Sequence, residues 1–502
     1  MSGVKDNEYF PNGRKIGWLD NRICFFMGIM DIIGIIHIFA KFMVVNFTAI
    51  NFLNTKVMKY YDRTYELGLL KDIQKRSFEE FSKMTVLKGR RRIGKTTLGG
   101  LAMEATDSVY LFVSKKAEAD LCAEYSEAIR KSLGEFVPQG IYHFKDIFSL
   151  LLSIGKHRRF NLFIDEFQDF LYVNPTIYSD IQDVWDHERR SSNVNLVVSG
   201  SVFTLMEKIF KDEKQPLFGR ADLSITLEPF RTDVMKEILA DHKTGYTNDD
   251  LLALYCFTGG VPKYVELLMD NGCTDMESMV AYMTRPDSQF FEEGKNMLIQ
   301  EFGKNYGTYF SILGVIASGE VCLPQIEGLL GERSLGGQMK TLEEDYGLIS
   351  KKRPIRSSET SKAVRYEIND VFLRFWFRYF DRYRSLIEIK NYSALAAIIR
   401  DDYPTYSGRI LERWFRQKMI ESQQYLEIGG WWHTKRGNAD TAQENEIDIV
   451  AVSLDGKVHA YEVKRNRKKY SPALMARKTA DLSESAFGRQ EVISGCLSLE
   501  DM

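Results

Sequence analysis

The feature that most constrains the fold of this chain is a glycine-bracketed segment at residues 84–97, MTVLKGRRRIGKTT. It contains the pattern Gly89-x-x-x-x-Gly94-Lys95-Thr96, with a β-like apolar run before it and a helix-compatible segment after it. Glycines allow the backbone N–H groups to wrap phosphate oxygens, and the amino end of the following helix adds a positive dipole. The alternative is a glycine-rich turn with a solvated lysine. In this setting the pattern predicts a P-loop on a parallel α/β sheet.

The same loop supplies the residues that we expect to hold a nucleotide. Lys95 is expected to reach the β- and γ-phosphates, and the hydroxyl of Thr96 is expected to hold Mg²⁺. The predicted nucleotide-binding residues of this segment are Gly89, Arg90, Arg91, Arg92, Ile93, Gly94, Lys95, Thr96 and Thr97.

A second strand-like run, RFNLFIDE at residues 159–166, ends in two acids. A run buried on both faces is typical of a central parallel strand, and ligands of such sheets lie at the carboxyl ends of the strands. We therefore expect Asp165 to face the Mg²⁺ and Glu166 to polarise a water for attack on the γ-phosphate. The alternative is an exposed carboxylate pair, but the order and spacing after the P-loop favour a site.

Two further polar residues belong to this prediction. Ser199 ends the strand-like run VNLVVS at residues 194–199 and is expected to sense the γ-phosphate. Arg220 precedes another strand-like run at 223–227 and is a candidate arginine finger. It would act within its own subunit or across a homo-oligomer, and a plain surface arginine is an equal alternative.

Residues 58–287 carry additional motifs that resemble a known family. These are YDRTYEL from Tyr61, IDEFQ from Ile164, VSGS from Val198, FGR from Phe218 and GGVP from Gly259. With the P-loop, they resemble the AAA+-like archaeal ATPase family, which is close to the STAND NTPases. The resemblance implies ATP as the nucleotide, an ATPase core at 58–230, a helical lid at 231–302 and a GGVP stretch near the base. No guanine-type N-K-x-D motif occurs, in agreement with ATP.

Composition places the chain among ordinary globular proteins. Its 502 residues are 44% hydrophobic and 27% charged, with a net charge of −2, which excludes a disordered or collagen-like chain and suggests several domains. The six cysteines are scattered without a C-x-x-C pair, so neither a zinc site nor a disulfide framework is visible. We therefore expect a reducing compartment, the cytoplasm.

The first 57 residues form a predicted extension that contains a strongly apolar run at 23–45. The run is long enough to span a bilayer, but Asp31, His37 and Lys41 interrupt it. It also lacks the small-residue cleavage site of a signal peptide. Three interpretations stay open: upstream sequence read into the gene, a membrane anchor, and a buried hydrophobic arm. Upstream sequence is the favoured interpretation, ahead of a membrane anchor.

Residues 303–384 read as three helices followed by two strands around a polar loop, the order of a winged helix. Ten basic and four acidic residues lie between 351 and 384, so this segment is predicted to contact DNA phosphates. The alternative is a protein-contact module with a solvated wing. The aromatic run at 372–380 is expected to be the core of a connecting helix.

Residues 385–502 are predicted to form a restriction-endonuclease-like α/β domain. Asp448 and the pair Glu462-x-Lys464, with Glu412 on an upstream helix, resemble the PD-(D/E)XK nuclease superfamily. Residues 406–470 also resemble the nuclease-like domain of unknown function that ends many archaeal-type ATPases. The resemblance implies Mg²⁺ on Asp448 and Glu462. Ile447 replaces the usual proline before the first acid, which leaves the activity open.

The predicted acidic site depends on strand register. A two-residue turn at Asp455-Gly456 pairs Asp448 with Val463 on the wrong face, whereas a three-residue loop with a left-handed Gly456 pairs Asp448 with Glu462. We predict the second form or an equivalent kink. Seven basic residues between 464 and 478 are expected to add a phosphate-binding surface.

Two main functions follow from these predictions. One is a Mg²⁺-dependent ATPase coupled to a DNA-binding winged helix and to a nuclease in DNA processing or defence. The other is a non-cutting ATP-driven switch whose carboxyl-terminal domain only binds nucleic acid or protein. A weaker third is an ATPase tethered to a membrane by residues 23–45.

Overall fold

The computed structural model describes residues 58–302, 306–319, 321–331, 334–432 and 446–502, which all fall within one compact unit. The predicted extension at 1–57, with its apolar run, lies outside the described residues. Among the helices that are described, none is long and apolar enough to cross a bilayer.

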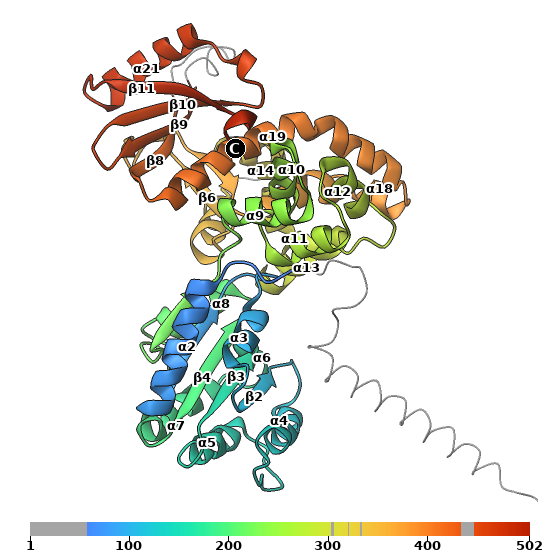
Figure 1. Cartoon of the computed structure of the whole chain (residues 1–502), viewed down its shortest axis with the longest axis vertical. Coiled ribbons are helices and arrows are strands. Elements are labelled where there is room, and N and C mark those ends of the chain that lie inside the picture. The colour runs from blue at the N-terminus through green and yellow to red at the C-terminus, as the bar shows by residue number, and fades with distance from the viewer. Residues whose placement is uncertain (1–57, 303–305, 320, 332–333, 433–445) are drawn as a thin grey trace, which may run out of the picture. The chain divides into compact units, whose positions relative to one another are not determined.

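A five-stranded sheet forms the amino-terminal part of this unit (Figure 1). Its strands are β1 Lys83–Lys88, β2 Ser108–Phe112, β3 Phe160–Asp165, β4 Val194–Gly200 and β5 Leu223–Thr226, in the order β2-β3-β4-β1-β5. Every neighbouring pair is parallel. Strands β1, β3 and β4 are buried along their whole length, which explains why they read as apolar runs. The predicted parallel sheet is confirmed.

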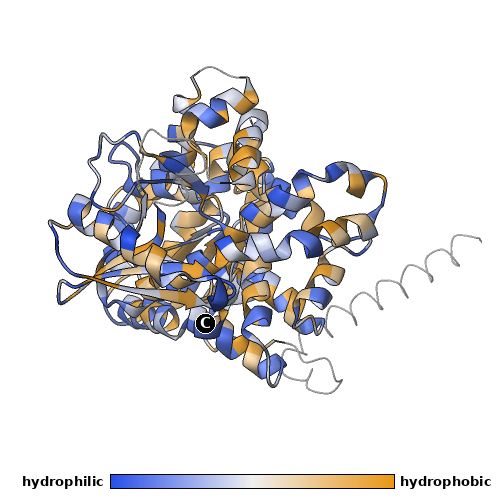
Figure 2. Cartoon of the chain, turned by 90° about the horizontal axis from the view of Figure 1, so that it is seen from above, coloured by the Kyte–Doolittle hydropathy of each residue, from blue (hydrophilic) through white to orange (hydrophobic). Residues whose placement is uncertain are grey.

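Helices cover both faces of the sheet. Helices α2 Thr64–Glu79 and α3 Lys95–Met103 share a core with one face. The other face is covered by α4 Glu118–Leu133, α5 Phe144–Ile154, α6 Phe170–Val173, α7 Ile177–Glu188 and α8 Phe203–Lys211. Most helices carry both hydrophobic and hydrophilic residues, as expected of amphipathic helices that pack on a core (Figure 2).

A helical region follows the sheet. Its helices are α9 Thr232–His242, α10 Asn248–Thr258, α11 Pro262–Asp270, α12 Met276–Met283 and α13 Phe290–Phe302. Helix α10 is buried from Asp250 to Thr258, so it lies inside this region and not on its surface. These helices share one hydrophobic core with the elements that follow them.

Three helices and a hairpin come next in the chain. They are α14 Tyr306–Ser318, α15 Leu323–Leu330, α16 Gly336–Lys340, and the antiparallel pair β6 Ile349–Lys352 and β7 Arg365–Ile368. This is the element order on which the winged-helix interpretation rests, and that interpretation stays a prediction. Helix α17 Val371–Trp376 continues into the aromatic run, whose rings are buried, so this run is core.

The carboxyl-terminal part is a four-stranded sheet with helices packed against it (Figure 1). After α18 Arg384–Glu388 and the long α19 Tyr392–Ser422 come β8 Tyr425–Trp432, β9 Glu446–Ser453, β10 Val458–Lys464, α21 Pro472–Ala486 and β11 Val492–Ser498. The strand order is β11-β10-β9-β8, in which only β10 and β11 are parallel. One face packs on α21.

Candidate functional site

The P-loop connects β1 to α3 and has the backbone that the sequence predicts. Gly89 and Gly94 have φ values of 151° and 92°, and Gly94 directly precedes the first residue of α3. A Cβ on Gly89 would lie 2.8 Å from the carbonyl oxygen of Leu227, so a side chain does not fit there. The side chain of Lys95 folds back on the loop, and its Nζ donates to the carbonyl oxygens of Gly89 at 2.8 Å and of Arg90 at 3.0 Å.

Thr96 and Asp165 meet at the carboxyl ends of the strands. The hydroxyl of Thr96 donates to Oδ2 of Asp165 at 2.8 Å, and the hydroxyl of Ser199 donates to Oδ1 of the same carboxylate. Asp165 is only 5% exposed. A hydroxyl and a carboxylate this close are oxygen ligands of the kind that Mg²⁺ prefers, so these residues fit the ion that the sequence implies.

Tyr110 is a member of this cluster that sequence reasoning missed. Its hydroxyl on β2 donates to Oδ2 of Asp165 at 2.9 Å. Burial, and then the negative charge of Asp165, raise the pKa of Tyr110, so the phenol remains a donor. No local pattern marks this tyrosine, because its contact with Asp165 depends on the pairing of β2 with β3.

Glu166 lies in the turn after β3 with a left-handed backbone, φ 54°. Its Oε2 accepts hydrogen bonds from the Ser201 hydroxyl at 2.7 Å and from Gln168 Nε2 at 2.6 Å. The carboxylate is therefore held beside Asp165 in one orientation. Ser201 belongs to the VSGS motif, so the sequence already singled out its segment. The contact of Gln168 with Glu166 was not predicted.

Arg220 lies away from this cluster. It precedes β5, whose first residue Leu223 pairs with Thr85 near the amino end of β1, while the P-loop follows the carboxyl end of β1. Its Nη2 pairs with Asp186 of α7 at 2.7 Å. A role of Arg220 as a finger within its own subunit is therefore not supported. Because the strands are parallel, Arg220 lies near their amino ends, whereas the P-loop lies at their carboxyl ends.

Two P-loop arginines point away from the loop towards carboxylates far along the chain. Arg90 Nη1 lies 3.2 Å from Asp370 Oδ2, and Arg90 Nη2 donates to the carbonyl oxygen of Gly347 at 3.0 Å. Arg92 Nε lies 3.0 Å from Oε1 of the buried Glu293. The sequence predicts these arginines only as parts of the loop backbone, and their side-chain partners were not anticipated.

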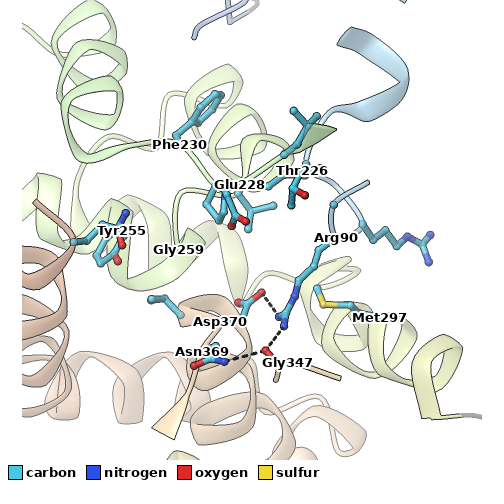
Figure 3. Close-up of a pocket in the computed structure, with 18 of the residues that line it drawn as sticks. Arg90, Thr226, Glu228, Phe230, Tyr255, Gly259, Met297, Gly347, Asn369 and Asp370 are labelled. Atoms are coloured by element: carbon cyan, nitrogen blue, oxygen red, sulfur yellow. Dashed lines mark hydrogen bonds and ion pairs between the residues drawn. The ribbon is translucent and has the colours of Figure 1, made fainter. Parts of the chain in front are cut away.

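A pocket of about 440 Å³ adjoins the loop (Figure 3). Its walls come from the P-loop, the stretch 226–230 that begins at the end of β5, the start of the GGVP motif and residues 369–371. Arg91 lines it as well. Figure 3 shows the guanidinium of Arg90 joined to Asp370 and to Gly347, which also line this pocket.

The carboxyl-terminal hairpin has the predicted register. Tyr461 pairs with Ile449, and the same register places Asp448 opposite Glu462. Gly456 has a φ of 80°. The pairing of β8 with β9 also shifts by one residue between Gly429 and Trp431, a bulge next to Asp448.

Asp448 and Glu462 share a compact cluster with two lysines. Lys464 Nζ lies 2.7 Å from Glu462 and 3.6 Å from Asp448, and the buried Lys478 of α21 also donates to Glu462. Asp448 Oδ2 accepts from the backbone N–H of Val463 at 2.7 Å.

The pKa values of the two acids in this cluster are shifted in opposite directions. Burial raises the pKa of Asp448, although the charge of Lys464 opposes this. Burial alone would also raise the pKa of Glu462, but hydrogen bonds from Lys464 and Lys478 outweigh it and hold that pKa below its ordinary value. Two carboxylates that could bind a cation are thus already balanced by two ammonium groups.

Glu412 pairs with Arg416, one turn further along α19, and Arg416 in turn donates to the backbone carbonyl of Asp448 at 2.7 Å. Within the described residues, no group of three or more His, Cys, Asp or Glu side chains is arranged to hold a metal ion. Metal binding by Asp448 and Glu462 therefore stays a prediction for two acidic ligands.

The basic runs counted in the sequence are largely used inside the molecule. Lys478 is buried against Glu462, Arg465 pairs with Asp249 at 2.8 Å, and Arg374 is buried in the core. A count of charges along the chain therefore overestimates the positive surface, because it cannot tell which cations have carboxylates opposite them.

Comparison with known proteins gives two family models that match separate parts of this chain. Residues 60–268 match the model of an ATPase domain predominantly from Archaea. Residues 376–474 match a family described as archaea bacterial proteins of unknown function. An uncharacterised protein of Methanocaldococcus jannaschii is 29% identical over 408 residues, which cover 79% of this chain and 85% of that protein.

Two solved structures are similar to this chain at low sequence identity. The Walker-type ATPase of Pyrococcus abyssi is 16% identical with a TM-score of 0.50, over 65% of this chain and 99% of that one. The Aeropyrum pernix ORC2 protein in its ADPNP–ADP complexes is 13% identical with a TM-score of 0.39, over 66% and 97% of the two chains. The chain thus contains a P-loop ATPase domain of the kind found predominantly in Archaea, followed by a carboxyl-terminal region shared with that second family.

Proposed function

We propose that this protein hydrolyses ATP with Mg²⁺ at the P-loop and uses the cycle to act on DNA in the cytoplasm. The single observation that carries the ATPase proposal is the 2.8 Å hydrogen bond between Thr96 and Asp165. It unites the end of the P-loop with the acidic strand end, which is the pairing that a nucleotide-bound magnesium ion requires.

The residues divide the chemistry between them. Mg²⁺, when bound, neutralises charge on the β- and γ-phosphates. Lys95 is next to the same loop and exchanges its bonds to the loop carbonyls for phosphate oxygens. Glu166, held by Ser201 and Gln168, orients a water whose oxygen bonds to the γ-phosphorus while the bond to the ADP oxygen breaks.

The test is ATP turnover by the purified full chain with and without Mg²⁺. Lys95→Ala is expected to abolish nucleotide binding, and Glu166→Gln to bind ATP while turnover falls about a hundredfold or more. Hydrolysis that survives in purified Lys95→Ala protein would refute the site.

DNA is the proposed partner, and the hairpin β6–β7 beside short helices supports a winged helix as the contact. Asp448, Glu462 and Lys464 lie together as a PD-(D/E)XK-like site would require, which supports the nuclease-like interpretation. Cleavage of plasmid DNA that depends on a divalent metal and is lost in Asp448→Ala and Glu462→Ala tests it.

One observation favours the alternative of a non-cutting switch. Lys478 donates to Glu462 inside the fold, where an active nuclease would bind metal. If the wild type and both alanine variants are equally inert on single-stranded DNA, duplex DNA and RNA, the switch replaces the nuclease.

A homo-oligomer completes the proposal. Arg220 lies near the amino ends of the strands, away from its own P-loop, so a finger role requires a neighbouring subunit. Mixing Arg220→Ala chains with Lys95→Ala chains tests this, because turnover returns only if one chain lends its arginine to the other.

A further inference from the structure

A second pocket, of about 290 Å³, lies between the hairpin β6–β7, helix α19 and strands β8 and β9. Six cationic side chains line it: Lys351, Lys352, Arg353, Arg365, Arg413 and Arg416. We call it the basic pocket. Four of them belong to the basic stretch at 351–384, and Arg413 and Arg416 come from α19, up to 65 positions from Lys351.

The carboxylates in the lining do not balance this charge. Only Glu367 and Glu446 line the pocket, and each is already engaged, with Lys352 at 2.8 Å and Arg365 at 2.6 Å respectively. Burial would raise the pKa of Glu367, yet Arg413 and Lys352 bring it down to about 2. The lowered pKa has the direction expected of a carboxylate that lies beside these two cations.

Two of the cations lack counter-charges. Within the part of the chain that the structure describes, neither Lys351 nor Arg353 has a carboxylate partner, and Nε of Arg353 is buried without a hydrogen-bond partner. Both side chains are partly exposed, and a bound anion would supply the counter-charge that they lack.

The shape of the pocket limits what can enter. Its volume is near the lower end for small-molecule sites, so a nucleotide-sized group fits and a duplex does not. Trp432 closes one side, with the guanidinium of Arg365 over its ring at 4.5 Å. Gly430 leaves room for Arg416, whose Nη2 would lie 3.0 Å from a Cβ at that position.

We propose that the basic pocket binds a nucleotide phosphate. Guanidinium groups present paired donors that match phosphate oxygens, and the pocket supplies several of them at one place. The phosphate has two sources that share this chemistry: a free mononucleotide, or the 5′-phosphorylated end of a nucleic-acid strand.

The basic pocket shares lining residues with the pocket beside the P-loop. Asn369 and Arg413 line both the basic pocket and the pocket beside the P-loop. Asn369 Nδ2 donates at 2.9 Å to the carbonyl oxygen of Gly347, the same oxygen that accepts from Arg90 (Figure 3). A phosphate bound beside Asn369 would therefore lie next to a residue that shares a hydrogen-bond acceptor with the P-loop arginine.

The test uses the full chain with Lys95→Ala, which removes the P-loop as a competing phosphate site. AMP and inorganic pyrophosphate are titrated by calorimetry. A fluorescent single-stranded 12-mer is titrated by anisotropy with a 5′-phosphate and with a 5′-hydroxyl. Arg353→Gln and Lys351→Gln are the pocket variants. Lys362→Gln, an exposed cation in the loop of the same hairpin, is the matched control.

We expect Arg353→Gln to weaken binding about tenfold, the value of one charge-assisted hydrogen bond, and Lys362→Gln to change it less than twofold. AMP binding without a preference for the 5′-phosphorylated strand identifies a free nucleotide, and a preference for that strand identifies its end. Absence of binding by all four probes, or equal affinity in the Lys95→Ala chain and in both pocket variants made on it, overturns the proposal. ATP turnover that persists in Lys95→Ala overturns the P-loop assignment instead, so the two failures are distinct.

Discussion

Arg90 in the P-loop forms an ion pair with Asp370 at 3.2 Å, across 280 positions of sequence. Asp370 is the residue before α17 and caps that helix by accepting from the N–H of Leu373 at 2.9 Å. The loop that would hold the phosphates is thus tied to the start of the aromatic helix.

Asp370→Asn is expected to release Arg90 while keeping the helix cap, because the asparagine side-chain oxygen still accepts from Leu373. A freed guanidinium beside the phosphates should tighten ATP binding about three- to tenfold. Calorimetric titration of ATP measures this. Arg90→Gln should abolish the gain from Asp370→Asn, whereas Asp345→Asn, an exposed acid nearby, should leave affinity unchanged. Additive effects of the two substitutions would contradict the link.

Lys478→Met is expected to lower the melting temperature by several degrees. The substitution leaves the buried Glu462 with Lys464 as its remaining cation, and loss of one buried partner costs about 1–3 kcal/mol when another remains. Differential scanning fluorimetry measures the shift. The neighbouring Arg477→Met is the control, since Arg477 is exposed. Equal shifts for both variants would show that Lys478 does not act through Glu462.

The ion pair of Glu367 predicts a pH dependence. Its pKa falls from the ordinary 4.5 to about 2 in the folded protein, so its ionised form stabilises the fold above about pH 4.5 and that contribution is lost as the pH falls towards 2. Glu367→Gln should therefore lower the melting temperature at pH 7 and lower it less at pH 4. Glu359→Gln, exposed in the same hairpin loop, should show no such difference. A gap that grows on acidification would reverse the assigned sign.

The sequence predicts well what local spacing encodes. The P-loop, the acidic strand end at Asp165 and the three-residue hairpin loop with Gly456 each follow from patterns within a few residues, and the structure has them all. Parallel strands bring their carboxyl ends together, so the meeting of Thr96 with Asp165 was also within reach.

The sequence could not predict side-chain partners that are brought together by tertiary packing. Tyr110 reaches Asp165 through strand pairing, and Lys478 reaches Glu462 through the packing of α21 on the sheet. Neither contact leaves a periodic signal. The sequence left open whether Arg220 acts in its own subunit, and only the pairing of β5 with β1 shows that it lies away from its own P-loop.

The most direct test of the central claim is ATP binding with and without Mg²⁺, measured by calorimetry on the wild type, Thr96→Val, Asp165→Asn and Lys95→Ala. If Thr96 and Asp165 hold the ion together, Mg²⁺ strengthens ATP binding in the wild type, and either substitution removes that gain while metal-free binding remains. Lys95→Ala loses both. An undiminished Mg²⁺ effect in Asp165→Asn would contradict the account.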